Sequence, residues 1–206
     1  MPANYNNSAW FYDRLSRLVY GMAMIDSQRF LLTFIPSGSK VLIVGGGTGR
    51  VLEEIARSHA EGLEITYVEI AARMMAVSQT RNTGNNAIVF INNAIENVCL
   101  QTDFDVVITP FFFDSFTQRN FERLFGHIDS ALKPGGLWLN CDFQLAGKWW
   151  QSILLKTMYL FFRVICNIEA LRLPAIQKEF ELRGYKKLTR KAFYGNFILS
   201  EVYSRA

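Results

Sequence analysis

The architecture of this chain is determined by one stretch, Val41-Leu42-Ile43-Val44-Gly45-Gly46-Gly47-Thr48-Gly49-Arg50. Its consecutive apolar residues predict a strand buried on both faces, as in a parallel sheet covered by helices. The glycines that follow let the backbone turn tightly and let a ligand approach it closely. A helix predicted to begin at Arg50 points its free backbone N–H groups into the same crevice. Because the dinucleotide-binding fingerprint requires a glycine at position 50, this turn departs from it in its last element.

Around this stretch, apolar runs alternate with segments of helical periodicity. The predicted strands are Lys40–Val44, Glu64–Glu69, Ala87–Ile91, Phe104–Thr109 and Gly136–Asp142, and the predicted helices between them are Arg50–His59, Ala71–Arg81 and Phe116–Leu132. Such alternation implies βαβ units with right-handed crossovers, and therefore a parallel sheet of the α/β class. Near the end, Tyr185–Phe193 and Phe197–Tyr203 flank Gly195-Asn196, a turn pair typical of an antiparallel hairpin.

Two segments lie outside this alternation. One is an N-terminal helical region, Ser8–Phe34, and the other is the apolar segment Lys148–Ile168. We therefore predict a single domain over residues 1–206, with residues 1–38 as a helical cap and residues 148–170 as an inserted apolar helix.

The inserted helix has an unusually narrow polar stripe, formed by Ser152, Lys156, Arg163 and Asn167. The N-terminal helix, a second subunit, a membrane surface or an apolar substrate must cover the rest. Its apolar run is roughly 24 Å long as a helix, whereas a bilayer core needs about 30 Å. Peripheral contact with a membrane is therefore compatible with this helix, and crossing is not.

The composition limits the size of the core, the kinds of partner and the cellular compartment that are expected. Half of the 206 residues are apolar, enough for one sizeable core, and the net charge is +4. The basic group Lys186, Lys187, Arg190 and Lys191 is either a solvated sheet edge or a face for RNA or membrane phosphates, and a nucleic-acid partner is not favoured. Cys99, Cys141 and Cys166 lie in apolar segments without metal spacing, which predicts buried thiols in a reducing cytoplasm. No secretory signal and no metal-binding cluster is recognisable.

Two polar residues follow the second and third strands. Glu69 lies about twenty residues past Gly49, where an acidic side chain accepts hydrogen bonds from a ribose diol. The alternative is a surface carboxylate at a strand end. Asn93 follows the third strand and either pairs with an adenine amino group or serves as an ordinary loop or cap residue.

Together these elements resemble the class I S-adenosylmethionine-dependent methyltransferase family. Val41–Gly49 matches its glycine-rich motif, Glu69 its ribose-binding acid, Asn93-Ala94 its adenine-side loop, Phe104–Thr109 its fourth strand and Leu132–Gly136 its turn before strand five. The resemblance implies a Rossmann-like, mostly parallel seven-stranded sheet with an antiparallel last strand and helices on both faces. It also implies S-adenosylmethionine as cofactor, held by Gly45, Gly46, Gly47, Gly49, Glu69, Ile70, Asn93, Ala94, Thr109 and Pro110.

Finer features are similar to the quinone-biosynthesis and phospholipid methyltransferases. These are Tyr12-Asp13-Arg14-Leu15 in the leading helix, and Phe180–Tyr185 before the terminal hairpin. Two positions depart from the family pattern, since Ile43 replaces an acid that many members carry and Asn93 stands where Asp is common.

Aminopropyltransferases share the glycine turn and the Val68–Ile70 strand end, but they need acidic residues directly after the fourth strand. Here Thr109-Pro110-Phe111-Phe112-Phe113 precedes Asp114. Aromatic rings can surround a sulfonium by cation–π contact, worth about 0.5–2 kcal/mol, and can hold an apolar acceptor. Methyl transfer to a small lipophilic or aromatic acceptor is therefore favoured over aminopropyl transfer, and a non-catalytic cofactor-binding protein is a further alternative.

Candidate catalytic residues are few. His59 and His127 lie away from the strand ends where α/β sheets bind ligands, so packing or capping roles are expected. Asp114 and Tyr12 are the candidates to touch the acceptor, the alternatives being a helix cap and packing. Methyl transfer is an in-line displacement that depends chiefly on positioning, so a strong base is not essential. We expect the acceptor in a cavity of roughly 300 Å³ or more, between Phe111–Phe113 and the Trp149–Ile168 helix.

Overall fold

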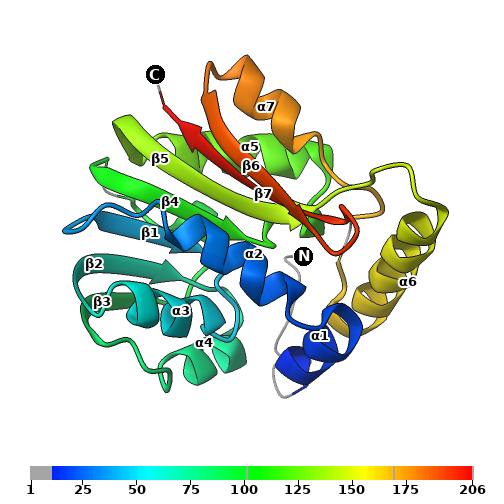
Figure 1. The fold of residues 1–206 in the computed structure, drawn as a ribbon, viewed down its shortest axis with the longest axis horizontal. Helices are drawn as coiled ribbons and strands as arrows, with labels where there is room; N and C mark the ends of the chain where they lie inside the picture. Colours follow the sequence, from blue (N-terminus) through cyan, green and yellow to red (C-terminus); the bar gives the residue numbers. More distant parts are fainter. Residues whose placement is uncertain (1–10, 101, 169, 206) are drawn as a thin grey trace.

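The structure is a computed structural model that describes residues 11–100, 102–168 and 170–205. Its seven strands form one sheet in the order β3-β2-β1-β4-β5-β7-β6 (Figure 1). The strands are β1 Lys40–Val44, β2 Glu61–Val68, β3 Asn85–Ile91, β4 Phe104–Pro110, β5 Leu132–Phe143, β6 Lys186–Phe193 and β7 Ile198–Ser204. Strands β1 to β5 pair in parallel, and β7 runs antiparallel to both of its neighbours. The predicted sheet is confirmed.

Helices cover both faces of this sheet. They are α1 Tyr12–Tyr20, α2 Ala23–Leu32, α3 Arg50–Ser58, α4 Ala72–Ser78, α5 Gln118–Asp129, α6 Trp149–Cys166 and α7 Ile176–Leu182, with short 3₁₀ turns η2 Ile95–Asn97 and η3 Phe113–Ser115. Successive residues of a strand point to opposite faces. Ile43 and Val106 accordingly pack in the core with α2, α3 and α6, whereas Leu42 and Val107 pack in the core with α5 and α7.

The N-terminal segment differs from the single predicted helix Ser8–Phe34. The chain bends at Gly21, with φ 59° and ψ −125°, and this bend separates α1 from α2. Residues 8–10 lie outside the described residues. Helix α6 follows its prediction closely and lies beside α1 at the edge of the molecule (Figure 1). Tyr20 donates a hydrogen bond to the Met158 sulfur, and the Tyr12 ring lies 6.2 Å from that of Phe162.

Two further predictions need correction, and one helix was not predicted. Helix α5 ends at Asp129, and the segment from Leu132 belongs to β5, where the pairing with β4 slips before Leu137 because Gly135 takes a left-handed φ of 75°. Helix α7 was not predicted, because a seven-residue helix is too short to produce a clear periodic signal. Cys99 is exposed, since it points outward in the loop after η2, whereas Cys141 and Cys166 are buried.

The basic group near the C-terminus lies on the exposed edge strand β6. Lys187 forms an ion pair of 3.1 Å with Glu201, and the Lys191 ammonium lies over the Phe30 ring. Both cations are thus engaged by the protein itself. Among the described residues, no helix combines the length and the hydropathy that crossing a membrane requires.

Candidate functional site

The glycine turn connects β1 to α3 in a space that larger residues could not occupy. A Cβ on Gly46 would come within 2.3 Å of the Tyr67 ring, and one on Gly45 within 2.4 Å of the Phe112 ring. Tyr67 also donates a hydrogen bond of 2.9 Å to the carbonyl of Gly47. The turn is therefore held between two aromatic rings, with its backbone exposed to the crevice at the end of β1.

Glu69 lies next to this turn, immediately after β2. Its Oε2 accepts a hydrogen bond from the Gly47 N–H (3.0 Å) and its Oε1 one from the Ala71 N–H (2.8 Å). Burial raises the pKa of Glu69 above its usual value, and the same backbone N–H groups partly oppose that rise. Each carboxylate oxygen can accept a further hydrogen bond, so the side chain is suited to hold a diol.

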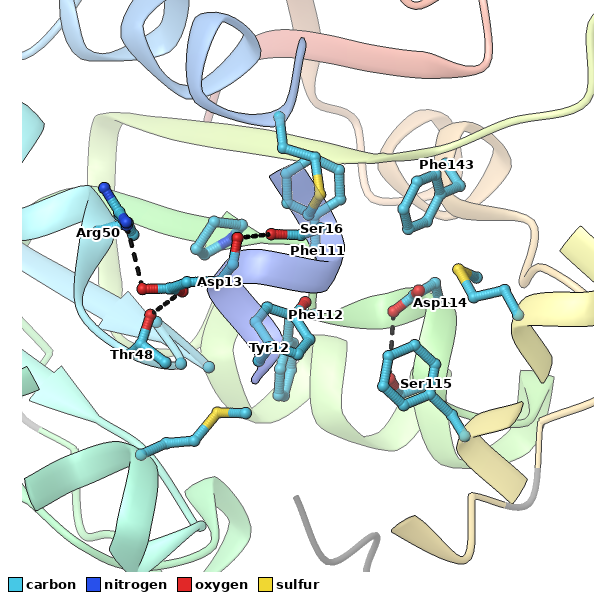
Figure 2. A pocket seen from close by; sticks show the side chains of 18 of the residues that line it. Tyr12, Asp13, Ser16, Thr48, Arg50, Phe111, Phe112, Asp114, Ser115 and Phe143 are labelled. Atoms are coloured by element: carbon cyan, nitrogen blue, oxygen red, sulfur yellow. Dashed lines mark hydrogen bonds and ion pairs between the residues drawn. The ribbon is translucent and has the colours of Figure 1, made fainter. Parts of the chain in front are cut away.

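A cavity of about 340 Å³ extends from the glycine turn to α6. Most of the predicted cofactor residues line it, namely Gly45, Gly46, Gly47, Glu69, Ile70, Ala94 and Pro110. Both predicted acceptor residues, Tyr12 and Asp114, line it as well. Figure 2 places Thr48 and Arg50 at one end, Asp114 and Phe143 at the other, and Tyr12 with Phe111 and Phe112 between them. This one cavity includes the expected cofactor crevice and reaches α6, and Phe111 and Phe112 line it but Phe113 does not.

Three predicted cofactor residues do not line the cavity. Gly49 brings α3 against α4, since a Cβ there would come 2.7 Å from the Ser78 Cβ. Asn93 is exposed, and its side chain accepts a hydrogen bond from the Ala94 N–H. Thr109 is fully buried, where it donates to Asn140 (2.9 Å) and accepts from the Trp138 indole (3.0 Å).

The aromatic wall predicted over Phe111–Phe113 consists of only two rings. Phe113 points away from the cavity into the core between the sheet and α5, where its ring lies 4.9 Å from the Phe121 ring. Phe111 has a φ of 53°, which is strained for a residue with a large side chain. This bend at the end of β4 turns its ring toward the cavity, 5.2 Å from the Phe143 ring.

Asp114 is the buried carboxylate at the aromatic end. Its Oδ1 accepts a hydrogen bond from the Ser115 hydroxyl (3.1 Å), and the Tyr159 hydroxyl donates to its backbone carbonyl (3.1 Å). Burial raises the pKa of Asp114 to about 7. A carboxyl group with such a pKa exchanges a proton readily near neutral pH.

Asp142 lies behind Asp114 and fixes its backbone. One oxygen of Asp142 accepts from the N–H groups of Phe113 (3.0 Å) and Asp114 (3.3 Å), and the other accepts from that of Phe143. Burial, followed by the charge of Asp114, raises the pKa of Asp142 well above its usual value. In this apolar site, ionisation of one carboxyl group therefore disfavours ionisation of the other.

Two further polar side chains, Tyr12 and Gln28, line the cavity. Burial, and then the charge of Asp114, raise the pKa of Tyr12, so its hydroxyl stays protonated and can only donate or accept a hydrogen bond. Gln28 was not predicted. Its Oε1 is buried on the cavity, and no donor among the described residues reaches it.

Asp13 was also missed as a site residue, although its motif was noted. Its carboxylate accepts hydrogen bonds from the Thr48 hydroxyl (2.6 Å) and from Arg50 (3.1 Å), both shown in Figure 2. It also accepts one from Arg81 (2.6 Å). These contacts anchor α1 over the glycine turn. No local pattern predicts them, because the three donors are 35 to 68 residues away in the chain.

Residues 41–136 match the profile of a family described as "Methyltransferase domain". A search among curated proteins finds no significant sequence match. Solved structures with the same fold include magnesium protoporphyrin IX methyltransferase from Synechocystis PCC 6803 with bound S-adenosylhomocysteine. It is 14% identical with a TM-score of 0.69, and the alignment covers 98% of this chain and 97% of that one.

Two other structures are similar over most of their length. One is 1,6-didemethyltoxoflavin-N1-methyltransferase from Burkholderia thailandensis, with bound 1,6-didemethyltoxoflavin and S-adenosylhomocysteine. It is 13% identical with a TM-score of 0.67, covering 95% of this chain and 84% of that one. The other is a SAM-dependent methyltransferase from Aquifex aeolicus, 13% identical with a TM-score of 0.62, covering 93% of each chain.

The fold, the glycine turn followed by Glu69, and the matched segment lead to one classification. Residues 41–136 match the methyltransferase-domain family, and the described chain has the fold of S-adenosylmethionine-dependent methyltransferases. S-adenosylmethionine is the cofactor of that family.

Proposed function

We propose that the protein is a cytoplasmic enzyme that transfers a methyl group from S-adenosylmethionine to a small lipophilic or aromatic acceptor. The observation that carries this proposal is the continuity of the cavity. It joins Glu69 and the glycine turn to an end lined by Tyr20, Phe111 and Met158. Such an end favours an apolar molecule over a charged one. An apolar acceptor is consistent with peripheral contact between the protein and a membrane. A nucleic acid, which is polyanionic, is not expected as a partner.

The residues at the strand ends fit the cofactor. Glu69 would accept hydrogen bonds from the ribose hydroxyls, the glycine backbone would border the chain that carries the sulfur, and Ile70 and Ala94 would flank the adenine. When bound, the cofactor supplies a methyl group attached to a positively charged sulfur. Phe111 and Phe112 provide aromatic faces that stabilise a positive charge.

Asp114 is proposed as the base that acts on the acceptor. Its carboxylate would take the proton from an acceptor hydroxyl or amine while the acceptor attacks the methyl carbon. Tyr12 and Gln28 would orient the acceptor, Tyr12 through its hydroxyl and Gln28 by accepting a hydrogen bond with its free oxygen. Positioning by the surrounding rings would lower the remaining barrier.

Cofactor binding is the first expected result. At a hundredfold excess over the dissociation constant, S-adenosylmethionine or S-adenosylhomocysteine stabilises the folded state by about 2.7 kcal/mol. The melting temperature should then rise by roughly 5–10 °C in differential scanning fluorimetry, with NADH as the control. A response to NADH and none to the adenosyl compounds would overturn the proposal.

Catalysis is tested with radiolabelled S-adenosylmethionine and a panel of phenols, quinols and amines of graded hydrophobicity. Incorporation of label into the apolar members supports the proposed acceptor class, and preference for charged members contradicts it. Binding without any incorporation, even with a cell extract as acceptor, would favour a non-catalytic cofactor-binding protein.

The variant Glu69→Gln is expected to weaken cofactor binding by about ten- to a hundredfold in titration calorimetry, since hydrogen bonds to a charged acceptor are strong. The unliganded variant should still fold, with a melting temperature lower by a few degrees, because the amide NH2 cannot accept the hydrogen bond that one of the two backbone N–H groups donates to Glu69. Glu61→Gln, at the exposed start of the same strand, is the matched control. An affinity within about twofold of wild type would mean that Glu69 does not hold the ribose.

A further inference from the structure

Helix α6 presents an apolar row to solvent along its whole length. Trp149, Ile153, Leu160 and Val164 are 77%, 57%, 66% and 77% exposed. At about 100° per residue, these four side chains fall within an arc of about 60° around the helix. A solvated helix usually carries charged residues on such a face, so this row calls for a partner.

The two flanks of the row differ in chemistry. On one flank, Leu154, Thr157, Met158 and Phe161 line the cavity of the proposed active site. On the other flank, Ser152 and Lys156 line a second cleft of about 560 Å³, which α6 forms with the segment 171–177. The exposed row therefore lies between the active-site cavity and this cleft, on one helix.

The second cleft is positively charged. Lys156 and Arg172 both line it, and none of the described residues that line it is acidic. No ion pair joins either cation to a carboxylate within the described residues. Between Asp142 and Glu179 the sequence contains five cations, Lys148, Lys156, Arg163, Arg172 and Lys178, and one acid, Glu169.

Helix α1 extends this surface. It packs against α6 through Phe11 and Phe161, whose ring centroids are 6.1 Å apart. Leu18 is 84% exposed on α1, and Arg14 and Arg17 are exposed beside it. Apolar and cationic side chains thus alternate across both helices that border the cavity.

We infer that α6 docks on a bilayer that contains anionic phospholipid, lying in the plane of the interface. The apolar row would enter the boundary of the acyl chains, and the cleft of Lys156 and Arg172 would bind headgroup phosphates. The charge favours a bilayer over a second copy of the chain. In a two-fold dimer the same cations would face each other with almost no acids to offset them.

This docking would place the cavity next to the membrane. An apolar acceptor could then pass from the bilayer around α6, by way of Thr157 and Phe161, without crossing water. That passage rests on the proposed function, whereas the docking itself does not.

Vesicle flotation tests the docking with the wild-type protein, without cofactor or acceptor. Phosphatidylcholine vesicles with added phosphatidylglycerol should bind the protein about tenfold or more better than phosphatidylcholine alone. The pair Lys156→Glu and Arg172→Glu, which reverses both charges of the cleft, should abolish this preference. The matched control, Lys186→Glu with Arg190→Glu on the exposed strand β6, makes the same change in net charge and should retain it.

A second variant tests the apolar row. Ile153→Ser with Val164→Ser should lower binding to the anionic vesicles by about tenfold or more, while S-adenosylhomocysteine affinity shows that the fold is intact. Equal losses in the β6 control would overturn the inference, because binding would follow net charge alone. So would a concentration-dependent dimer in analytical ultracentrifugation that either the cleft variant or the row variant dissociates.

The failures of docking and of the proposed function can be told apart. Methylation of water-soluble aromatic acceptors without vesicle binding leaves the function standing and rejects the docking. Vesicle binding without methylation of any acceptor does the reverse.

Discussion

Replacing Asp114 with asparagine should lower the rate of methyl transfer by about a hundred- to ten-thousandfold, the usual contribution of a general base. The amide keeps the size of the side chain but cannot take a proton. Affinity for S-adenosylhomocysteine should stay within about twofold, because Asp114 lies at the acceptor end of the cavity. Asp103→Asn, an exposed carboxylate outside the cavity, is the matched control. Unchanged turnover would mean that the acceptor needs no base.

The pH dependence gives this prediction a second readout. Burial raises the pKa of Asp114 to about 7, so the active carboxylate form is present above that pH and is lost as the pH falls through it. Wild-type turnover should therefore rise through about pH 7, and the residual turnover of the asparagine variant should not.

The stability of the folded protein should change with pH in the opposite direction. The folded state holds the proton to a higher pH than the unfolded chain, so wild-type stability declines as the pH rises toward 7. The asparagine variant should show a smaller decline in thermal unfolding, since the raised pKa values of Asp142 and Glu69 still contribute to it.

Filling the acceptor end should have an effect of similar size. Met158 lines the cavity from α6, and the larger indole of Met158→Trp would displace an acceptor from its position. A displacement of about 1 Å can cost about a hundredfold in rate, so turnover should fall at least that far. Cofactor affinity should be retained in calorimetry.

Val164→Trp is the control for this variant, because it adds an indole on the exposed face of the same helix. Turnover of a soluble acceptor should be normal in the control. If Met158→Trp also turns over normally, the acceptor binds elsewhere and the lipophilic acceptor class loses its main support.

The cofactor half of the site was more predictable than the acceptor half, for a physical reason. The glycine turn and Glu69 follow consecutive parallel strands, and parallel strands place their carboxyl ends at one edge of the sheet. Sequence order alone therefore brings the two together. Phe113 is different, because the bend at Phe111 changes the direction of the chain and sends the third ring into the opposite core.

The residues that sequence analysis missed depend on contacts between distant segments. Asp13 gains its role only when α1 folds over the glycine turn and meets Arg50 and Arg81. Gln28 sits within an ordinary helical segment, and its free oxygen is evident only in three dimensions. The position of α6 beside α1 likewise follows from tertiary packing. The periodicity of α6 predicted that something covers its apolar surface, but it did not identify the partner.

The helical walls of the cavity come from a different part of the chain than the strand ends that hold the cofactor and Asp114. The glycine turn, Glu69 and Ala94 lie within residues 41–136, whereas α1, α2 and α6 lie outside this range and supply much of the acceptor end. Under selection, the helical walls can therefore diverge while the cofactor-holding strand ends stay constant. New acceptor specificities would arise mainly by exchanging or reshaping α1 and α6, and directed evolution should concentrate its libraries there.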